Sequence, residues 1–92
     1  MFGINGYAPL SMDSVIGVGF GKAWLSKGDE VVWEENHDDD CALMTVTEAE
    51  ALAAADPDQD WRIHYYGPLS EAHYQRQGAG LWVLYAKGEG FA

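Results

Sequence analysis

Hydrophobic and polar positions alternate along the first third of the chain, and strict alternation is typical of strands. In "SVIGVGFGKAWL", Ile16, Val18 and Phe20 share one face, and the other is mostly glycine. The overlapping stretch "KAWLSKGDEVVWEE" predicts a hairpin that turns through Lys27-Gly28-Asp29 and returns over Val31–Glu34. Three strands are therefore expected before residue 37.

The period changes in "TVTEAEALAAADP", which predicts the one helix of the chain. Thr45 with Glu48 and Thr47 with Glu50 both have the spacing of a capping box. Pro57 marks the end, because the residue before a proline avoids helical backbone angles. The expected buried stripe consists of Val46, Ala49, Leu52 and Ala53.

The last third predicts a meander of three strands, Trp61–Tyr66, Ala72–Gln77 and Leu81–Lys87, joined at "GPLS" and "GAG". Pairing Tyr66 with Ala72 and Gln77 with Leu81 makes one face of Arg62, His64, Tyr66, Tyr74, Arg76, Trp82 and Leu84. The other face then carries Trp61, Ile63, Tyr65, His73, Val83 and Tyr85. The fold class expected for residues 1–92 is a single α+β domain, with strand order β-β-β-α-β-β-β and one short helix packed on an antiparallel sheet.

Composition supports a folded, soluble domain. The chain has 92 residues, 48% of them hydrophobic, and its single cysteine excludes an intramolecular disulfide. The start "MFGINGYAPL" lacks the basic region of a signal peptide, and no apolar run reaches the ~20 residues that span a bilayer. We therefore expect a cytoplasmic protein.

The net charge of −10 is concentrated in the middle of the chain. Residues 29–60 hold twelve of the fifteen acidic residues and no lysine or arginine. Such a block either forms a solvated face or creates a field that repels nucleic acid and anionic membranes and attracts basic surfaces.

Motifs for bound ions and phosphates fail on inspection. In "DPDQDW", a calcium loop that starts at Asp56 needs glycine at the position of Trp61 and glutamate at that of Gly67. The run "GVGFGK" lacks the glycine and the Ser or Thr of a phosphate-binding loop, since Ile16 and Ala23 stand there. The cluster "HDDDC" (37–41) holds metal-ligating residue types, but contiguous residues rarely enclose one ion. We expect no metal and no cofactor.

Catalytic and nucleic-acid-binding patterns are equally sparse. Ser70 and His73 are close in sequence, but they lack an elbow motif and a third partner. The predicted sheet face with Arg62, His64 and Tyr66 has the basic and aromatic residues that bind single-stranded nucleic acid. The whole chain, however, has only five lysines and arginines against fifteen acidic residues. The sequence therefore predicts neither an enzyme nor a direct nucleic-acid binder.

The acidic block remains as the candidate binding feature. Duplex DNA presents one charge per ~1.7 Å of axis, and acids on loops, a helix and a hairpin can imitate such a pattern. Trp33 or Trp61 would supply an aromatic anchor. The predicted partner contacts are Glu34, Glu35, Asp38, Asp39, Asp40, Asp56, Asp58 and Asp60 with Trp33 and Trp61.

The stretch "DPDQDWRIHYYGPLSEAHYQRQGAGLWVLYAKGEGFA" resembles the C-terminal half of small uncharacterised proteins encoded by phages and prophages. "DWRIHYYGPL", "HYQRQG" and "WVLY" followed by "KGEGFA" carry this resemblance, which transfers no site residues. In size and acidity the whole chain is also similar to acidic anti-CRISPR proteins that mimic DNA. The resemblance implies a viral protein that inhibits a host defence complex in the cytoplasm of a bacterial host cell.

The predicted function is therefore an acidic inhibitor that occupies the basic surface of a host DNA-binding protein or CRISPR effector subunit. It would act as a monomer or weak dimer, without touching nucleic acid or membranes. Two alternatives stay open: a module such as an immunity protein that covers a basic toxin, and a phage structural or regulatory protein that self-associates through its aromatic sheet face.

Overall fold

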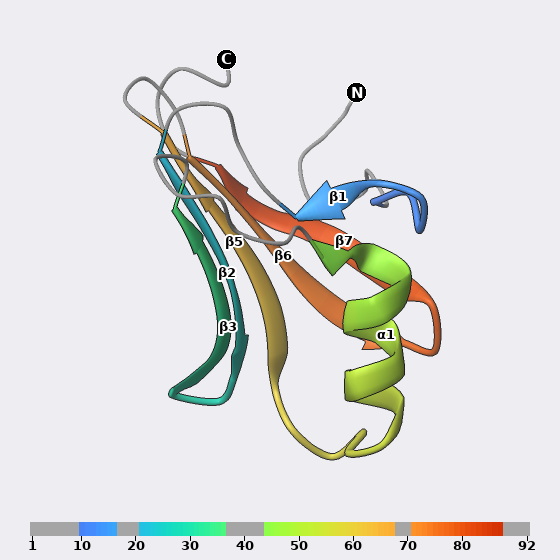
Figure 1. The fold of residues 1–92 in the computed structure, drawn as a ribbon. Coiled ribbons are helices and arrows are strands. Elements are labelled where there is room, and N and C mark those ends of the chain that lie inside the picture. The colour runs from blue at the N-terminus through green and yellow to red at the C-terminus, as the bar shows by residue number, and fades with distance from the viewer. Residues whose placement is uncertain (1–9, 17–20, 37–43, 68–70, 88–92) are drawn as a thin grey trace.

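The computed structural model describes residues 10–16, 21–36, 44–67 and 71–87, which form one helix and two antiparallel sheets (Figure 1). The elements are β1 (Val15–Ile16), β2 (Lys22–Lys27), β3 (Glu30–Asn36), β4 (Met44–Thr45), α1 (Val46–Ala54), β5 (Trp61–Tyr66), β6 (Glu71–Gly78) and β7 (Leu81–Lys87). The larger sheet has the order β3-β2-β5-β6-β7, and β1 pairs with β4. The predicted α+β class is confirmed; β4 is a strand that the sequence did not predict.

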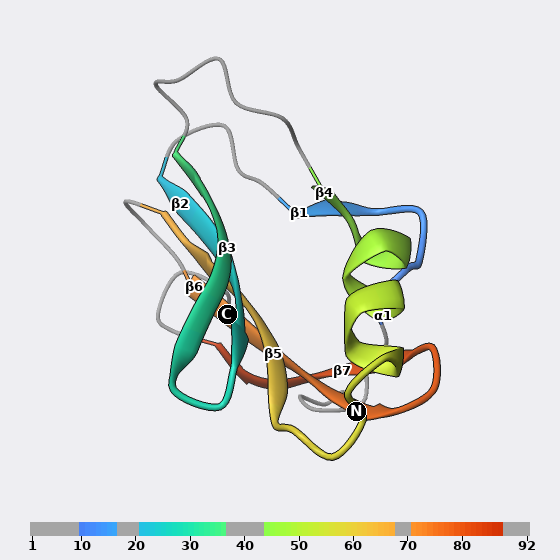
Figure 2. The ribbon, with the colours of Figure 1, turned by 60° about the horizontal axis from the view of Figure 1, so that its bottom comes forward.

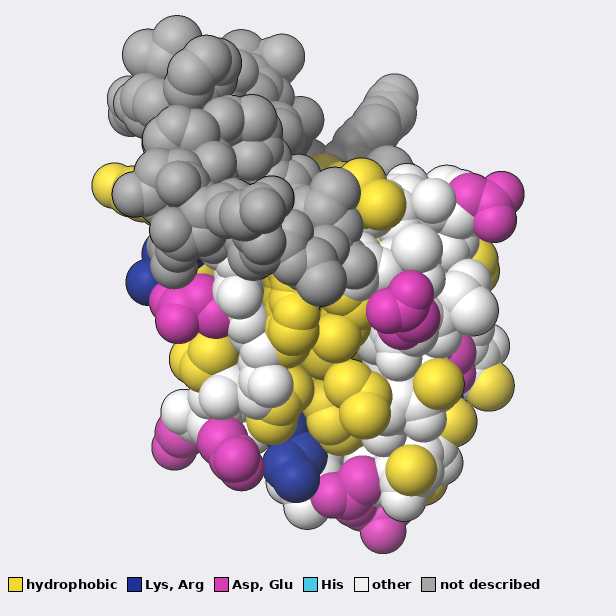
Figure 3. Space-filling model, in the orientation of Figure 1, with side chains coloured by type: hydrophobic (Ala, Val, Ile, Leu, Met, Phe, Trp, Pro, Cys, Tyr) yellow, Lys and Arg dark blue, Asp and Glu magenta, His cyan; other side chains and the backbone are white. Residues whose placement is uncertain are grey.

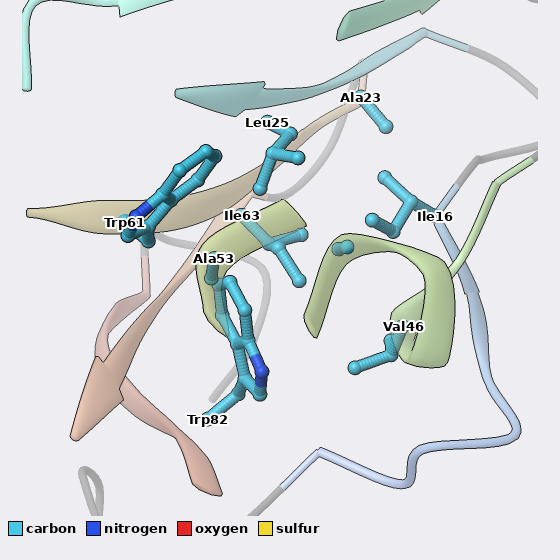
Figure 4. Close-up of a cluster of buried hydrophobic side chains, with 9 residues drawn as sticks. Ile16, Ala23, Leu25, Val46, Ala53, Trp61, Ile63 and Trp82 are labelled. Atoms are coloured by element: carbon cyan, nitrogen blue, oxygen red, sulfur yellow. The ribbon is translucent and has the colours of Figure 1, made fainter. Parts of the chain in front are cut away.

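The helix lies against one face of the five-stranded sheet. In Figures 1 and 2, α1 lies over that face beside the short β1–β4 pair, and the β2–β3 hairpin forms the edge of the sheet that is farther from α1. We call the face that carries α1 the helix face and the opposite one the outer face. Side chains from β2, β5, β7, α1 and β1 meet between the layers (Figure 4). This core contains Ile16, Ala23, Leu25, Val46, Ala49, Ala53, Trp61, Ile63 and Trp82.

The helix begins at the first of its two candidate caps. The Oγ1 of Thr45 accepts a hydrogen bond from the backbone N–H of Glu48 at 3.1 Å, as a capping box requires. Val46, Ala49 and Ala53 are fully buried. Leu52 is 45% exposed, so the predicted stripe is one residue too wide. The helix ends at Ala54, short of Pro57.

The meander has the predicted strands in a different register. Tyr65, and not Tyr66, pairs with Ala72, which rotates β5 by one residue relative to β6. A one-residue slip exchanges the two faces of a strand. The two predicted faces are therefore wrong: Ile63 and Tyr65 share the helix face with Tyr74, whereas Arg62 and His64 lie on the outer face.

Candidate functional site

The acids of the block that the structure describes do not form one continuous negative surface. Each of the four lysines and arginines whose side chains the structure describes pairs with an acid of the block. The pairs are Lys22–Glu34 at 2.7 Å, Lys27–Asp56 at 3.6 Å, Arg62–Asp60 at 2.9 Å and Arg76–Glu50 at 2.8 Å. Because opposite charges this close cancel at a distance, four of the nine described acids of the block are neutralised within the molecule.

One acid of the block, Glu35, is buried, and a second, Glu50, is partly buried. Glu35 is 2% exposed and lies on the helix face opposite Ala23. Glu50 accepts hydrogen bonds from Arg76 and from the indole of Trp82, and the Arg76 hydrogen bond lowers the pKa of Glu50 to about 2. A partner docking on the surface would not reach Glu35, so this placement counts against its predicted contact role.

Neither predicted aromatic anchor is freely exposed, and Glu34 lies apart from the predicted contacts Asp56, Asp58 and Asp60. Trp61 is 4% exposed, and its Nε1 donates to the backbone oxygen of Asp56 at 2.8 Å, so it serves the core and not a partner. Trp33 is half-buried against the same core. Glu34 lies four residues along β3 from Glu30 at the turn, which is roughly 13 Å in an extended strand. Asp38, Asp39 and Asp40 lie outside the described residues, as do Cys41 and Ser70.

One group of acids is brought together, and it sits where two connections meet. The backbone N–H of Gly28, in the β2–β3 turn, donates to the backbone oxygen of Asp60 at 2.9 Å. This hydrogen bond joins the turn to the α1–β5 connection. Both lie at the lower end of the molecule in Figure 1. We name this region the acidic end; it contains Asp29, Glu30, Asp56, Asp58 and Asp60. Figure 3 shows acidic side chains in separate groups on the helix side, with hydrophobic side chains between them.

The acidic end keeps a net negative charge after its internal pairs are counted. Lys27 and Arg62 neutralise Asp56 and Asp60, respectively. Asp29, Glu30 and Asp58 are exposed and form no ion pair among the described residues. Asp60 is held in place, since Gln75 also donates to it at 2.7 Å, and its pKa is lowered chiefly by the Arg62 hydrogen bond. The acidic end therefore presents three exposed carboxylates that no described lysine or arginine neutralises.

Aromatic and imidazole rings form a row across the outer face. Trp24 stacks on His64 with centroids 4.6 Å apart and planes 6° apart, and His64 meets the edge of His73 at 5.0 Å. His73 in turn meets Tyr85 at 5.7 Å. No histidine is visible from the helix side in Figure 3. The 4.6 Å between the ring centroids nearly equals the spacing between neighbouring strands, so the two rings project in parallel from the sheet. Each ring therefore covers one face of the other.

This row differs from the single-strand platform that the sequence suggested. Tyr74, Arg76 and Trp82 lie on the helix face, where Arg76 and Trp82 contact Glu50. On the outer face, Arg62 bonds the Tyr85 hydroxyl at 2.7 Å and stacks over its ring at 4.8 Å. Bases stack on exposed ring faces, and the contacting faces of the Trp24–His64 pair are covered.

Ser26 and His64 are the described residues that come nearest to a nucleophile and its base. The Ser26 Oγ lies 2.9 Å from His64 Nε2. Burial, the nearby His73 and Arg62 lower the pKa of His64 to about 4, so the imidazole is neutral and weakly basic at pH 7. His64 Nδ1 is buried and has no hydrogen-bond partner in the described structure, so no third group orients the ring there. Within the described part of the chain, no group of three or more His, Cys, Asp or Glu residues is arranged to hold a metal.

A hollow of about 310 Å³ opens on the outer face where the ring row meets the acidic end. Its floor is Ser26 and Gly28, small residues in successive outward positions along β2 and its turn. Sequence reasoning placed neither Ser26 nor Asp29 in a site. The sequence signal for this hollow was that two small residues, Ser26 and Gly28, stand two positions apart, while the neighbouring strands carry larger side chains.

No protein-family model, no curated protein and no solved structure matches this chain. The similarity to phage proteins and to acidic inhibitors accordingly stays a prediction from the sequence. Among the described residues no helix has both the length and the apolar character needed to cross a bilayer.

Proposed function

We propose that the protein is a non-enzymatic inhibitor that docks its acidic end on the basic surface of a nucleic-acid-binding protein and competes there with DNA. The observation that carries the proposal is the junction of the β2–β3 turn with the α1–β5 connection through Gly28 and Asp60. It gathers five carboxylates from two parts of the sequence and leaves three of them free.

The anchoring of this end favours binding over a merely solvated face. Asp60 and Asp56 are fixed by Arg62 and Lys27, and the turn is tied to β5, so the free carboxylates of Asp29 and Asp58 stand on a rigid frame. A fixed charge pattern loses little conformational freedom on binding and steers a basic partner toward one orientation. Glu34 and the residues near it would act at most as a second, separate contact, because they lie at the opposite end of β3.

The biological setting that we propose is a phage-encoded inhibitor of a bacterial defence complex, such as a CRISPR effector. The resemblance of residues 56–92 to phage proteins and the net charge of −10 support this setting. An immunity-type module that covers a basic toxin differs in one respect: its partner does not bind DNA at the covered surface.

Capture from a bacterial lysate tests the docking surface. The test variant Asp29→Asn/Glu30→Gln/Asp58→Asn removes the three free carboxylates, which form no ion pair among the described residues. The control Asp13→Asn/Glu48→Gln/Glu71→Gln makes the same change of net charge away from the acidic end. We expect the test variant to lose the captured partner and the control to keep it. Equal capture by the intact protein and both variants would place docking elsewhere.

A further inference from the structure

We propose that the hollow beside the acidic end is a socket for one basic side chain, a lysine or an arginine, of the partner protein. The inference rests on the proposed function, since it names what the partner inserts beside the acidic end. The socket requires an opening of suitable size, walls that accept an aliphatic stem, and a carboxylate free to receive the cationic head.

The shape of the hollow follows from the side chains on three adjacent strands. The residues of β2 and its turn that line the hollow are Trp24, Ser26 and Gly28, so their side chains become smaller toward the turn. Val31 of β3 is opposite Ser26 on one side, and Arg62 of β5 is opposite it on the other. The stacked Trp24–His64 pair closes the end that is farther from the turn. The result is a short channel whose floor is made of small residues and which opens at the acidic end.

The lining is mostly polar, with one aliphatic wall and with carboxylates at the end nearest the turn. Val31 is 52% exposed and offers an aliphatic wall, which suits the methylene stem of a long basic side chain. Asp29 and Asp60 lie at the turn end. Asp29 forms no ion pair among the described residues, whereas Asp60 is already engaged by Arg62 and Gln75. Asp29 is therefore the carboxylate available to the incoming head.

Arg62 is the feature that would oppose a second cation, and its own contacts answer that objection. One amino group bonds Asp60 at 2.9 Å, the other bonds the Tyr85 hydroxyl at 2.7 Å, and the guanidinium lies over the Tyr85 ring. Its charge is compensated by Asp60, so the lining retains one uncompensated charge, that of Asp29. An anionic ligand would meet this carboxylate, while a single basic side chain complements it.

The test uses pure peptides and the isolated protein. Gly-Arg-Gly and Gly-Lys-Gly, blocked at both ends, are titrated into labelled protein, with Gly-citrulline-Gly as the neutral match for arginine. The Trp24 indole N–H and the Gly28 amide report on the hollow by nuclear magnetic resonance. We expect saturable shifts at both reporters with at least one basic peptide, and none with the neutral peptide. The arginine and lysine arms show which head the socket prefers.

Single substitutions separate a socket from general attraction. Asp29→Asn should weaken the peptide affinity roughly fivefold, as loss of an exposed ion pair allows. Asp13→Asn, an equal change of charge away from the acidic end, should leave the peptide affinity unchanged. Equal weakening by both variants, shifts spread over the whole acidic end, or no shift at all would overturn the socket. Partner capture from a lysate is measured separately from peptide binding. Capture can therefore succeed when no peptide binds the hollow, and a peptide can bind when capture fails.

Discussion

Glu50 of α1 and Arg76 of β6, 26 residues apart in sequence, form a two-contact ion pair that fastens the helix to the sheet. Arg76 Nε lies 2.9 Å from Glu50 Oε1, and its amino group lies 2.8 Å from Oε2. The indole Nε1 of Trp82 donates to Oε1 at 2.9 Å. The side chain of Arg76 is 9% exposed and that of Glu50 is 15% exposed, so this acid of the block serves the fold.

Glu50→Gln should destabilise the protein because it leaves the arginine charge almost buried without its carboxylate. Removing one partner of a buried pair costs about 3–5 kcal/mol. Urea unfolding measures the change. The control Glu48→Gln, an exposed residue of the same helix, should stay within about 0.5 kcal/mol. Similar losses in both variants would mean that the pair does not fasten the helix.

The same pair predicts how stability responds to strong acid. The pKa of Glu50 is about 2 in the folded protein against an ordinary value of 4.5. A lowered pKa means that the unfolded chain takes up the proton first. The stabilisation by Glu50 is therefore complete above pH 4.5 and disappears as the pH falls toward 2. Unfolding of the intact protein and Glu50→Gln across this range measures it; the variant should show the smaller pH dependence.

His64 predicts a second decline at higher pH. Burial and the neighbouring His73 and Arg62 lower its pKa to about 4 from an ordinary 6.5. The unfolded chain then binds the proton first as the pH falls below 6.5, and stability should decrease until about pH 4. The ring resonances of His64 should titrate near pH 4. A midpoint near 6.5 would show that the stacked imidazole is not shielded as the structure indicates.

Gly21 allows a close backbone approach at the start of β2. Its φ is +122°, and a Cβ there would overlap the carbonyl oxygen of Tyr66. Gly21→Ala should therefore cost at least about 2 kcal/mol in thermal or urea unfolding, from strain and displacement of β5. Gly78→Ala is the matched control, because nothing lies within 4 Å of the added Cβ. Tolerance of both substitutions would contradict the approach of the two strands.

The sequence predicts elements better than it predicts their pairing. Trp61–Tyr66 is predicted correctly because Pro57 and Gly67 bound an apolar, aromatic run. The sheet faces are predicted incorrectly, because a one-residue shift between β5 and β6 leaves the alternation within each strand unchanged.

The candidate site was predictable only in part for a similar reason. The excess of acid in residues 29–60 is a property of the sequence, and Asp56, Asp58 and Asp60 do lie at the acidic end. Which acids are neutralised depends on contacts such as Arg76–Glu50 and Lys22–Glu34, made between distant residues. Burial of Glu35 likewise depends on the register of β3, in which this acid faces the helix side of the sheet.

Displacement of DNA from the captured partner tests the central proposal most directly. A labelled DNA duplex bound to the purified partner is titrated with the protein, and the fluorescence anisotropy is followed at several salt concentrations. We expect full displacement by the intact protein and by Asp13→Asn/Glu48→Gln/Glu71→Gln, weakening as salt rises. Asp29→Asn/Glu30→Gln/Asp58→Asn should displace DNA at least tenfold less effectively. DNA that stays bound while the protein also binds the partner would contradict competition at the acidic end.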